Sequence, residues 1–222
     1  MLFRSSVSQE QRSKIEASSD QRLIAIGAST GGPQALLRIL RTLPREMPPI
    51  LVVQHITPSF TQSFSNSLDA SCQMKVEVAV DGIKPIDGHI YVAPGDCHML
   101  LARENSDYRI RLSDHDRVNR HRPSVDELFR SVADHARQNA TGVLLTGMGR
   151  DGAAGMAQMR QNGAWTIAQD EASSVVFGMP SVAIEMGAAA RVMSLDHIPG
   201  ELVNHFTTNS GVSQRRARKG SV

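Results

Sequence analysis

The sequence predicts an α/β fold: a doubly wound, mainly parallel open sheet with helices on both faces and a short antiparallel edge. One observation is that short apolar runs alternate along the chain with amphipathic segments of helical spacing. Another is that runs such as 23–26 and 50–53 are apolar throughout and rich in β-branched residues, which is typical of parallel strands covered on both faces. Finally, no internal repeat or long linker divides the 222 residues, so we expect one sizeable domain.

The first half of the chain opens with a strand, a tight turn and a helix. The apolar run 23–26 stops at small residues, and Pro33 then begins an amphipathic segment. A second helix is expected from Pro58, where large apolar residues recur at helical spacing. Apolar or alternating runs predict further strands at 50–54, 75–80, 86–95, 98–102 and 108–112. The last two are expected to pair as an antiparallel edge or hairpin.

The second half repeats the alternation. Ser124 and Glu127 form the S-x-x-E pattern of a capping box, which predicts a helix that begins there and runs towards Gln138. A strand expected at 142–146 ends at the glycine-rich turn 147–152. The remaining expected elements are a helix through Met156 and Met159, a strand at 165–168, a helix from Pro180, a strand at 191–195 and a helix at 198–206.

The two ends of the chain differ from the domain expected at 23–207. Residues 1–22 are polar and lack the apolar stretch of a signal peptide, so we expect a disordered lead-in. Residues 208–222 are expected to form a basic disordered tail, with its charge on Arg215, Arg216, Arg218 and Lys219. Removing these four cations changes the formal net charge from +2 to −2, so the basic character belongs to the tail. A solvated terminus is favoured there over contact with lipid or nucleic acid.

Composition excludes several classes of function. Two tyrosines, one tryptophan and no interleaving of basic with aromatic residues argue against a nucleic-acid face. No apolar run approaches the roughly 18 to 20 residues of a membrane span. Cys72 and Cys97 are too few for a disulfide framework, and reduced cytosolic thiols are the expected state, so a cytoplasmic location is predicted.

The turn after the first strand carries a candidate nucleophile. Gly27–Gly31 fits the G-x-S-x-G pattern in which a strained turn exposes the oxygen of Ser29. The same glycines could cradle a phosphate, but Pro33 stands where a P-loop needs lysine. The dinucleotide fingerprint fails as well, because Ser29 stands where its second glycine should be. From this stretch alone, a nucleophile and a plain structural turn both remain open.

Ser29, His55 and Asp151 each follow an apolar strand. Ligand crevices of open parallel sheets lie beyond the carboxyl ends of the strands, so we expect the three side chains to meet there. Histidine can take the proton of a serine near neutral pH, and a carboxylate on its other ring nitrogen fixes the tautomer. Taken singly, the three also fit a turn residue, a hydrogen-bonded structural histidine and a helix N-cap. Their order along the chain is not that of ordinary lipases or esterases.

Other polar clusters give weaker signals. Asp96, Cys97 and His98 are adjacent and cannot easily converge on one ion, so no metal site is predicted. His115 and His121 bracket a charged loop that we expect to be solvated. Most methionines are expected to fill the core, with Met148 the exception because it lies near Asp151 in the sequence.

Five ordered blocks resemble the CheB family, the protein-glutamate methylesterases of bacterial chemosensory systems. The blocks are Gly27–Pro33, Val53–His55, Tyr91–Gly95, Arg122–Asp126 and Leu145–Ala153, and the resemblance covers 23–206. The family fold is also a doubly wound, mainly parallel sheet. The resemblance implies that Ser29, His55 and Asp151 are the catalytic residues. It further implies that Thr30 lies in the active site and that Met148 contributes a backbone amide there.

By this resemblance the expected reaction is hydrolysis of glutamate methyl esters on the cytoplasmic helices of chemoreceptors, with release of methanol. Family members can also deamidate receptor glutamines, and no metal or organic cofactor is implied. The alternative is a catalytically silent relative that acts as an interaction protein in a chemosensory or pilus pathway. The intact Ser29, His55 and Asp151 weigh against that alternative.

The N-terminal region departs from the family pattern. Family members usually carry a phosphoacceptor receiver domain ahead of the esterase, whereas 22 residues precede the first predicted strand here. We therefore expect the activity of this chain to be indifferent to small-molecule phosphodonors.

Overall fold

The computed structural model describes residues 8–9 and 21–217, with side chains described through residue 207. Most of the predicted lead-in, namely 1–7 and 10–20, lies outside the described residues. So do the last residues of the predicted tail, 218–222.

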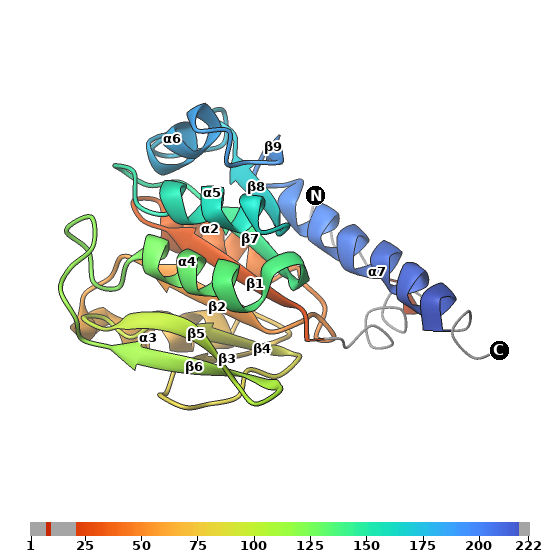
Figure 1. Ribbon diagram of the computed structural model, residues 1–222. Helices are drawn as coiled ribbons and strands as arrows, with labels where there is room; N and C mark the ends of the chain where they lie inside the picture. The colour runs from red at the N-terminus through yellow and green to blue at the C-terminus, as the bar shows by residue number, and fades with distance from the viewer. Residues whose placement is uncertain (1–7, 10–20, 218–222) are drawn as a thin grey trace.

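The central sheet has seven strands, and every neighbouring pair is parallel. The strands are β1 (Leu23–Ala28), β2 (Ile50–Gln54), β3 (Lys75–Val78), β4 (His89–Val92), β7 (Ala140–Leu144), β8 (Trp165–Gln169) and β9 (Arg191–Met193). Their order across the sheet is β3-β4-β2-β1-β7-β8-β9 (Figure 1). The first strand lies in the middle of the sheet, the next three strands of this sheet lie on one side of it, and the last three lie on the other. The predicted doubly wound parallel fold is confirmed, and the strand order reverses at β1, where such sheets place their ligand crevice.

The expected antiparallel pair forms a separate sheet. Strands β5 (His98–Glu104) and β6 (Asp107–Ser113) pair with each other and with no strand of the central sheet. Their apolar residues, including Met99, Leu101 and Ile110, are buried in the core that also contains helix α4 (Val125–His135). The pair is therefore a hairpin that covers a face of the sheet rather than its edge, because packing of one apolar face decides its position.

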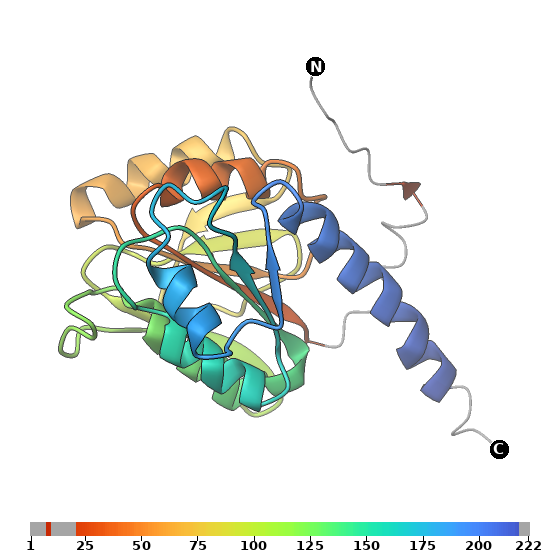
Figure 2. The same ribbon diagram turned by 90° about the horizontal axis from the view of Figure 1, so that it is seen from above.

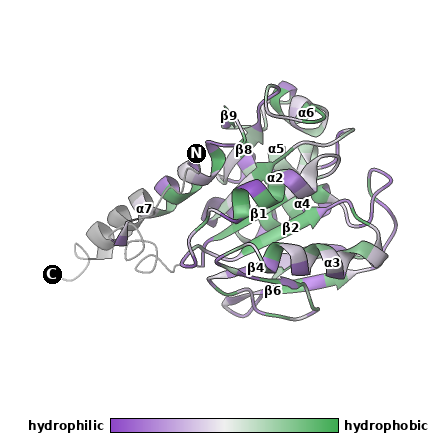
Figure 3. Ribbon diagram, turned by 180° about the vertical axis from the view of Figure 1, so that it is seen from behind, coloured by the Kyte–Doolittle hydropathy of each residue, from purple (hydrophilic) through white to green (hydrophobic). Residues whose placement is uncertain are grey.

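Two apolar cores lie on the two faces of the sheet. Along β1, Leu23 and Ala25 belong to one core, whereas Ile24 and Ile26 belong to the other. Successive side chains of a strand point to opposite faces, so a fully apolar strand supplies both cores. Figure 2 shows helices above and below the sheet, and Figure 3 shows the apolar central strands between them.

The helices divide between these two faces. The core with Leu23 contains buried residues of α4, α5 (Ala153–Gln161) and α6 (Met179–Glu185). The core with Ile24 contains residues of α2 (Gly32–Leu40), α3 (Pro58–Asp69) and α7 (Ile198–Ala217). After α4, a short 3-10 turn at Arg137–Asn139 leads into β7, so α4 ends before the predicted Gln138.

The capping-box prediction at Ser124 is wrong. Ser124 is the N-cap of α4, but its hydroxyl makes no capping bond and instead donates to Asp151 Oδ1 at 2.7 Å. The carboxylate of Glu127 contacts His115 and Arg130 rather than the N-cap backbone. The reason is that Asp151, which is remote in sequence, accepts the Ser124 hydroxyl and the backbone N–H groups of Val125 and Asp126.

The final helix is longer than predicted. Helix α7 continues to Ala217, so 208–217 are helical rather than a disordered tail. Its first turns are anchored in the core by Ile198, Leu202 and Phe206. A helix that is already nucleated extends readily, because each further residue adds one backbone hydrogen bond.

Candidate active site

Three strand ends converge beside β1. Ser29 directly follows β1, His55 directly follows β2, and Asp151 lies in the turn between β7 and α5. The backbone N–H of Ser29 donates to the carbonyl of Thr146 at 3.0 Å, and that of His55 donates to the carbonyl of Ala28 at 3.1 Å. These bonds extend the sheet past its regular strands and hold the side chains at a common edge.

The structure brings Ser29, His55 and Asp151 into direct contact. His55 Nδ1 lies 3.0 Å from Ser29 Oγ, and His55 Nε2 lies 2.8 Å from Asp151 Oδ2. Because Asp151 accepts a hydrogen bond from Nε2, the ring proton lies on Nε2. The lone pair of Nδ1 then faces the serine hydroxyl. The arrangement can therefore take a proton from Ser29.

Asp151 is almost completely buried, with a side-chain exposure of 1%. Besides His55 Nε2, its donors are the Ser124 hydroxyl, the Asn119 amide and the backbone N–H groups of Val125 and Asp126. Burial by itself would raise the pKa of Asp151, but hydrogen bonds from His55, Asn119, Ser124 and Val125 lower it to about 2. The carboxylate is thus ionised at neutral pH, and it also caps the N-terminus of α4.

Asn119 was not among the predicted site residues. Its Nδ2 donates to Asp151 Oδ1 and to Asp126 Oδ2, both at 2.8 Å. Asp126 is itself buried and accepts the backbone N–H of Gly155 at 2.7 Å. Asn119 therefore links two buried carboxylates on the side of Asp151 that His55 leaves open.

His121 also contacts the site, so the prediction of a solvated loop is wrong for this residue. Its ring stacks on that of His55, with centroids 3.6 Å apart and planes 10° from parallel. Burial lowers the pKa of His121, and the neighbouring His55 lowers it further. A neutral ring therefore lies on the imidazole face. No spacing in the sequence signals this contact, because it depends on how the loop 114–122 folds.

Thr30 follows Ser29 in the chain, and Met148 follows Gly147, which approaches Ser29. A Cβ on Gly147 would lie 2.8 Å from Ser29 Cβ. The Met148 side chain is exposed, as expected for a methionine outside the core. Within the described part of the chain, the backbone N–H groups of Thr30 and Met148 donate no hydrogen bond to the protein. Neither group is therefore used by the described fold.

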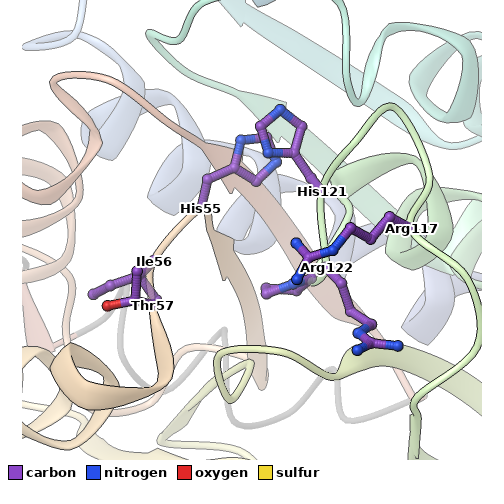
Figure 4. Close-up of a pocket in the computed structure, with 7 residues that line it drawn as sticks. His55, Ile56, Thr57, Arg117, His121 and Arg122 are labelled. Atoms are coloured by element: carbon purple, nitrogen blue, oxygen red, sulfur yellow. The ribbon is translucent and has the colours of Figure 1, made fainter.

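A cavity of about 240 Å³ adjoins the catalytic candidates. His55 and His121 form one wall, and Arg117, Arg122 and Thr57 contribute to the others (Figure 4). Among the residues described, no group of three or more His, Cys, Asp or Glu side chains is arranged to hold a metal ion. Across the same ranges, none of the helices combines the length and apolar character needed to cross a bilayer.

The chain is similar in sequence to known proteins. The sequence profile described as CheB methylesterase matches residues 24–202. A Salmonella typhimurium protein named protein-glutamate methylesterase/protein-glutamine glutaminase is 52% identical over 194 residues, which are 87% of this chain and 56% of that protein. A Shigella flexneri protein of the same name is 54% identical over the same shares of the two chains. The chain spans about half the length of the curated relatives that it matches.

The fold is also similar to that of a solved CheB methylesterase domain. The crystal structure of the Thermotoga maritima CheB methylesterase catalytic domain is similar with a TM-score of 0.81 and 39% sequence identity. The match covers 83% of this chain and 98% of that domain. Because the family profile, the relatives and the solved domain all match over most of its length, the chain belongs to the CheB methylesterase family.

Proposed function

We propose that this chain is a serine hydrolase that removes methyl esters from glutamate side chains of bacterial chemoreceptors and releases methanol. The observation that carries the proposal is the contact of His55 with both Ser29 and Asp151, at 3.0 Å and 2.8 Å. The names of its relatives support the substrate class. The substrates would be the cytoplasmic helices of the receptors, so the proposed place of action is the cytoplasm.

Acylation would begin at the serine. His55 Nδ1 removes the proton of Ser29, and Oγ attacks the ester carbonyl carbon. The carbonyl oxygen becomes an oxyanion, for which the free backbone N–H groups of Thr30 and Met148 are suitable donors. The intermediate then collapses with cleavage of the bond to the methoxy oxygen. His55 returns the proton to that oxygen, so methanol leaves and a glutamyl ester of Ser29 remains.

Deacylation would reverse these roles with water. His55 removes a proton from the water, whose oxygen attacks the acyl carbon, and the proton then passes to Ser29 Oγ. The products are a glutamate carboxylic acid, which ionises, and the free serine. Through both halves Asp151 stabilises the imidazolium and keeps its Nε2 proton in place. Deamidation of receptor glutamines would follow the same path with ammonia as the leaving group.

The competing function is that of a catalytically silent interaction protein. Methanol release from esterified receptor, measured for Ser29→Ala, His55→Ala and the double variant, separates the two. We expect each single variant to lose several orders of magnitude in turnover, and the double variant to be hardly worse, because the two groups act as a unit. Ser67→Ala, on the exposed side of α3, is the matched control and should keep full turnover.

A serine-directed fluorophosphonate probe gives a second readout on the same samples. It should label the unmodified chain and the Ser67→Ala variant but not Ser29→Ala. Normal methanol release by a well-folded Ser29→Ala variant would end the hydrolase proposal.

A further inference from the structure

The cavity beside His55, which we call the cationic pocket, has an unusual charge balance. Arg117 and Arg122 line it, and no acidic side chain does so in the described part of the chain. The reacting group cannot account for these charges, because a methyl ester and a glutamine amide are both neutral. The pocket therefore suits a second, anionic group that approaches together with the reacting side chain.

Arg122 is held in a fixed position. Its Nε and Nη2 both donate to Asp96 Oδ1 at 3.2 Å, and its Nη1 donates to the carbonyl of His115 at 3.0 Å and to that of Asp114. Its side chain is 21% exposed. A guanidinium fixed in this way loses little conformational freedom when a ligand binds beside it.

Arg117 supplies the charge that is not balanced. Its Nη2 donates to the same Asp96 oxygen at 3.0 Å, and its side chain is 56% exposed. One carboxylate thus serves two guanidinium groups, which leaves an excess of one positive charge in this trio. The positive charge of Arg117 also acts on His121, which stacks on His55. Burial and His55 lower the pKa of His121 most, Arg117 lowers it further, and Asp151 raises it.

A helix N-terminus adds to the positive potential. Thr57, which lines the pocket, is the N-cap of α3, and its side chain makes no capping bond. The first turn of α3 contains no acidic residue. The N-terminal end of the helix dipole is therefore not neutralised from within its own first turn.

From this arrangement we infer that the cationic pocket binds the carboxylate of an aspartate or glutamate that neighbours the esterified glutamate on the substrate helix. The inference rests on the proposed function, since it places a second contact of the same substrate. Side chains three or four positions apart on a helix have Cβ atoms about 5–6 Å apart, so one neighbour can enter the pocket while the ester reaches Ser29. Because the pocket shares His55 with the catalytic contact, the two positions are adjacent.

The test uses the full chain and helical peptides that contain one glutamate γ-methyl ester. In four peptides a single glutamate stands three or four residues before or after the ester, and in the reference peptide glutamine occupies all four positions. We expect at least one acidic peptide to exceed the reference by about fivefold in kcat/KM, the range of an exposed ion pair. The preference should vanish in Arg117→Gln and should shrink as salt is added.

Arg120→Gln is the matched control, because Arg120 lies in the same loop, is exposed and does not line the pocket. It should keep the preference. An equal preference in Arg117→Gln and in the unmodified chain would overturn the inference, as would equal rates for all peptides in the unmodified chain.

A binding measurement separates this inference from the proposed function. Fluorescence anisotropy compares the affinity of acidic and reference peptides for Ser29→Ala and for Ser29→Ala combined with Arg117→Gln. If no ester is hydrolysed, the proposed function fails, while an affinity preference that depends on Arg117 still supports the pocket. If the esters are hydrolysed but neither affinity nor rate depends on Arg117, the inference alone fails.

Discussion

At the scale of single residues, Asp151 serves both the site and the fold. Its carboxylate accepts a hydrogen bond from His55 Nε2–H and one from each of two backbone N–H groups at the start of α4. We therefore expect a change of this carboxylate to affect turnover and stability together. Ser29 differs, because loss of its hydroxyl removes only the contact with His55 and little buried apolar area.

The lowered pKa of Asp151 predicts how the stability of the fold depends on pH. The folded pKa of about 2 lies below the ordinary 3.8, so the carboxylate stabilises the fold above about pH 4, and this contribution is lost as the pH falls towards 2. The contribution is about 2 kcal/mol. Asp151→Asn should lack it, and its turnover should fall by up to ~10⁴ because the amide favours the wrong tautomer of His55.

Urea unfolding at a series of pH values, with methanol release at neutral pH, measures both effects. Asp134→Asn, an exposed position on α4, is the control and should follow the unmodified chain. Parallel stability curves for Asp151→Asn and the unmodified chain between pH 4 and pH 2 would contradict the assignment of the acid-sensitive contribution to this carboxylate.

At the scale of elements, the turn after β7 is built around Gly147. A Cβ there would lie 2.2 Å from Met179 Sδ and 2.8 Å from Ser29 Cβ. The contact with Met179 involves the end of a flexible side chain, whereas the contact with Ser29 involves the candidate nucleophile. The turn therefore approaches Ser29 only because residue 147 has no side chain.

Gly147→Ala should separate the turn from the serine. We expect turnover to fall by about 10²-fold, because the substitution would displace the Met148 amide, the proposed oxyanion donor, and a shift of about 1 Å costs that much. Methanol release and thermal unfolding are measured on the same sample. Gly200→Ala, whose Cβ would meet nothing within 4 Å, is the control and should leave both unchanged. Full turnover in Gly147→Ala would show that the approach is not needed.

Local sequence patterns predicted most of the elements but only part of the site. Apolar runs and glycine-rich turns located the strands, and the rule for parallel sheets brought Ser29, His55 and Asp151 together. The contributions of Asn119 and His121 could not be predicted, because the loop 114–122 takes its shape from contacts with Asp126, Asp151 and His55. Ser124 shows the same limit, since a distant carboxylate displaced its local capping role.

At the scale of the whole molecule, the sheet separates two apolar cores. Leu128 on α4 and Ile39 on α2 are both fully buried, one in each core. Residues without shared neighbours contribute independently to stability. The two faces should therefore respond to mutation as separate units, although they share the strands.

This independence is testable with two substitutions. Leu128→Ala should lower the free energy of unfolding by about 2–5 kcal/mol, and Ile39→Val by about 0.5–1.5 kcal/mol. The double variant should lose the sum of the two to within about 0.5 kcal/mol. Urea unfolding measures all three variants, and a coupling above about 1 kcal/mol would mean that the sheet transmits strain from one face to the other.

The winding of the sheet from its centre also affects synthesis on the ribosome. Ser29 and His55 emerge before Asp151, which lies 96 positions after His55. At the usual pace of translation, about 5–20 residues per second, the nascent chain carries the serine and histidine for about 5–20 seconds before the aspartate exists. Because β7 must then dock beside β1, the proposed catalytic site is incomplete until the second half of the domain has folded.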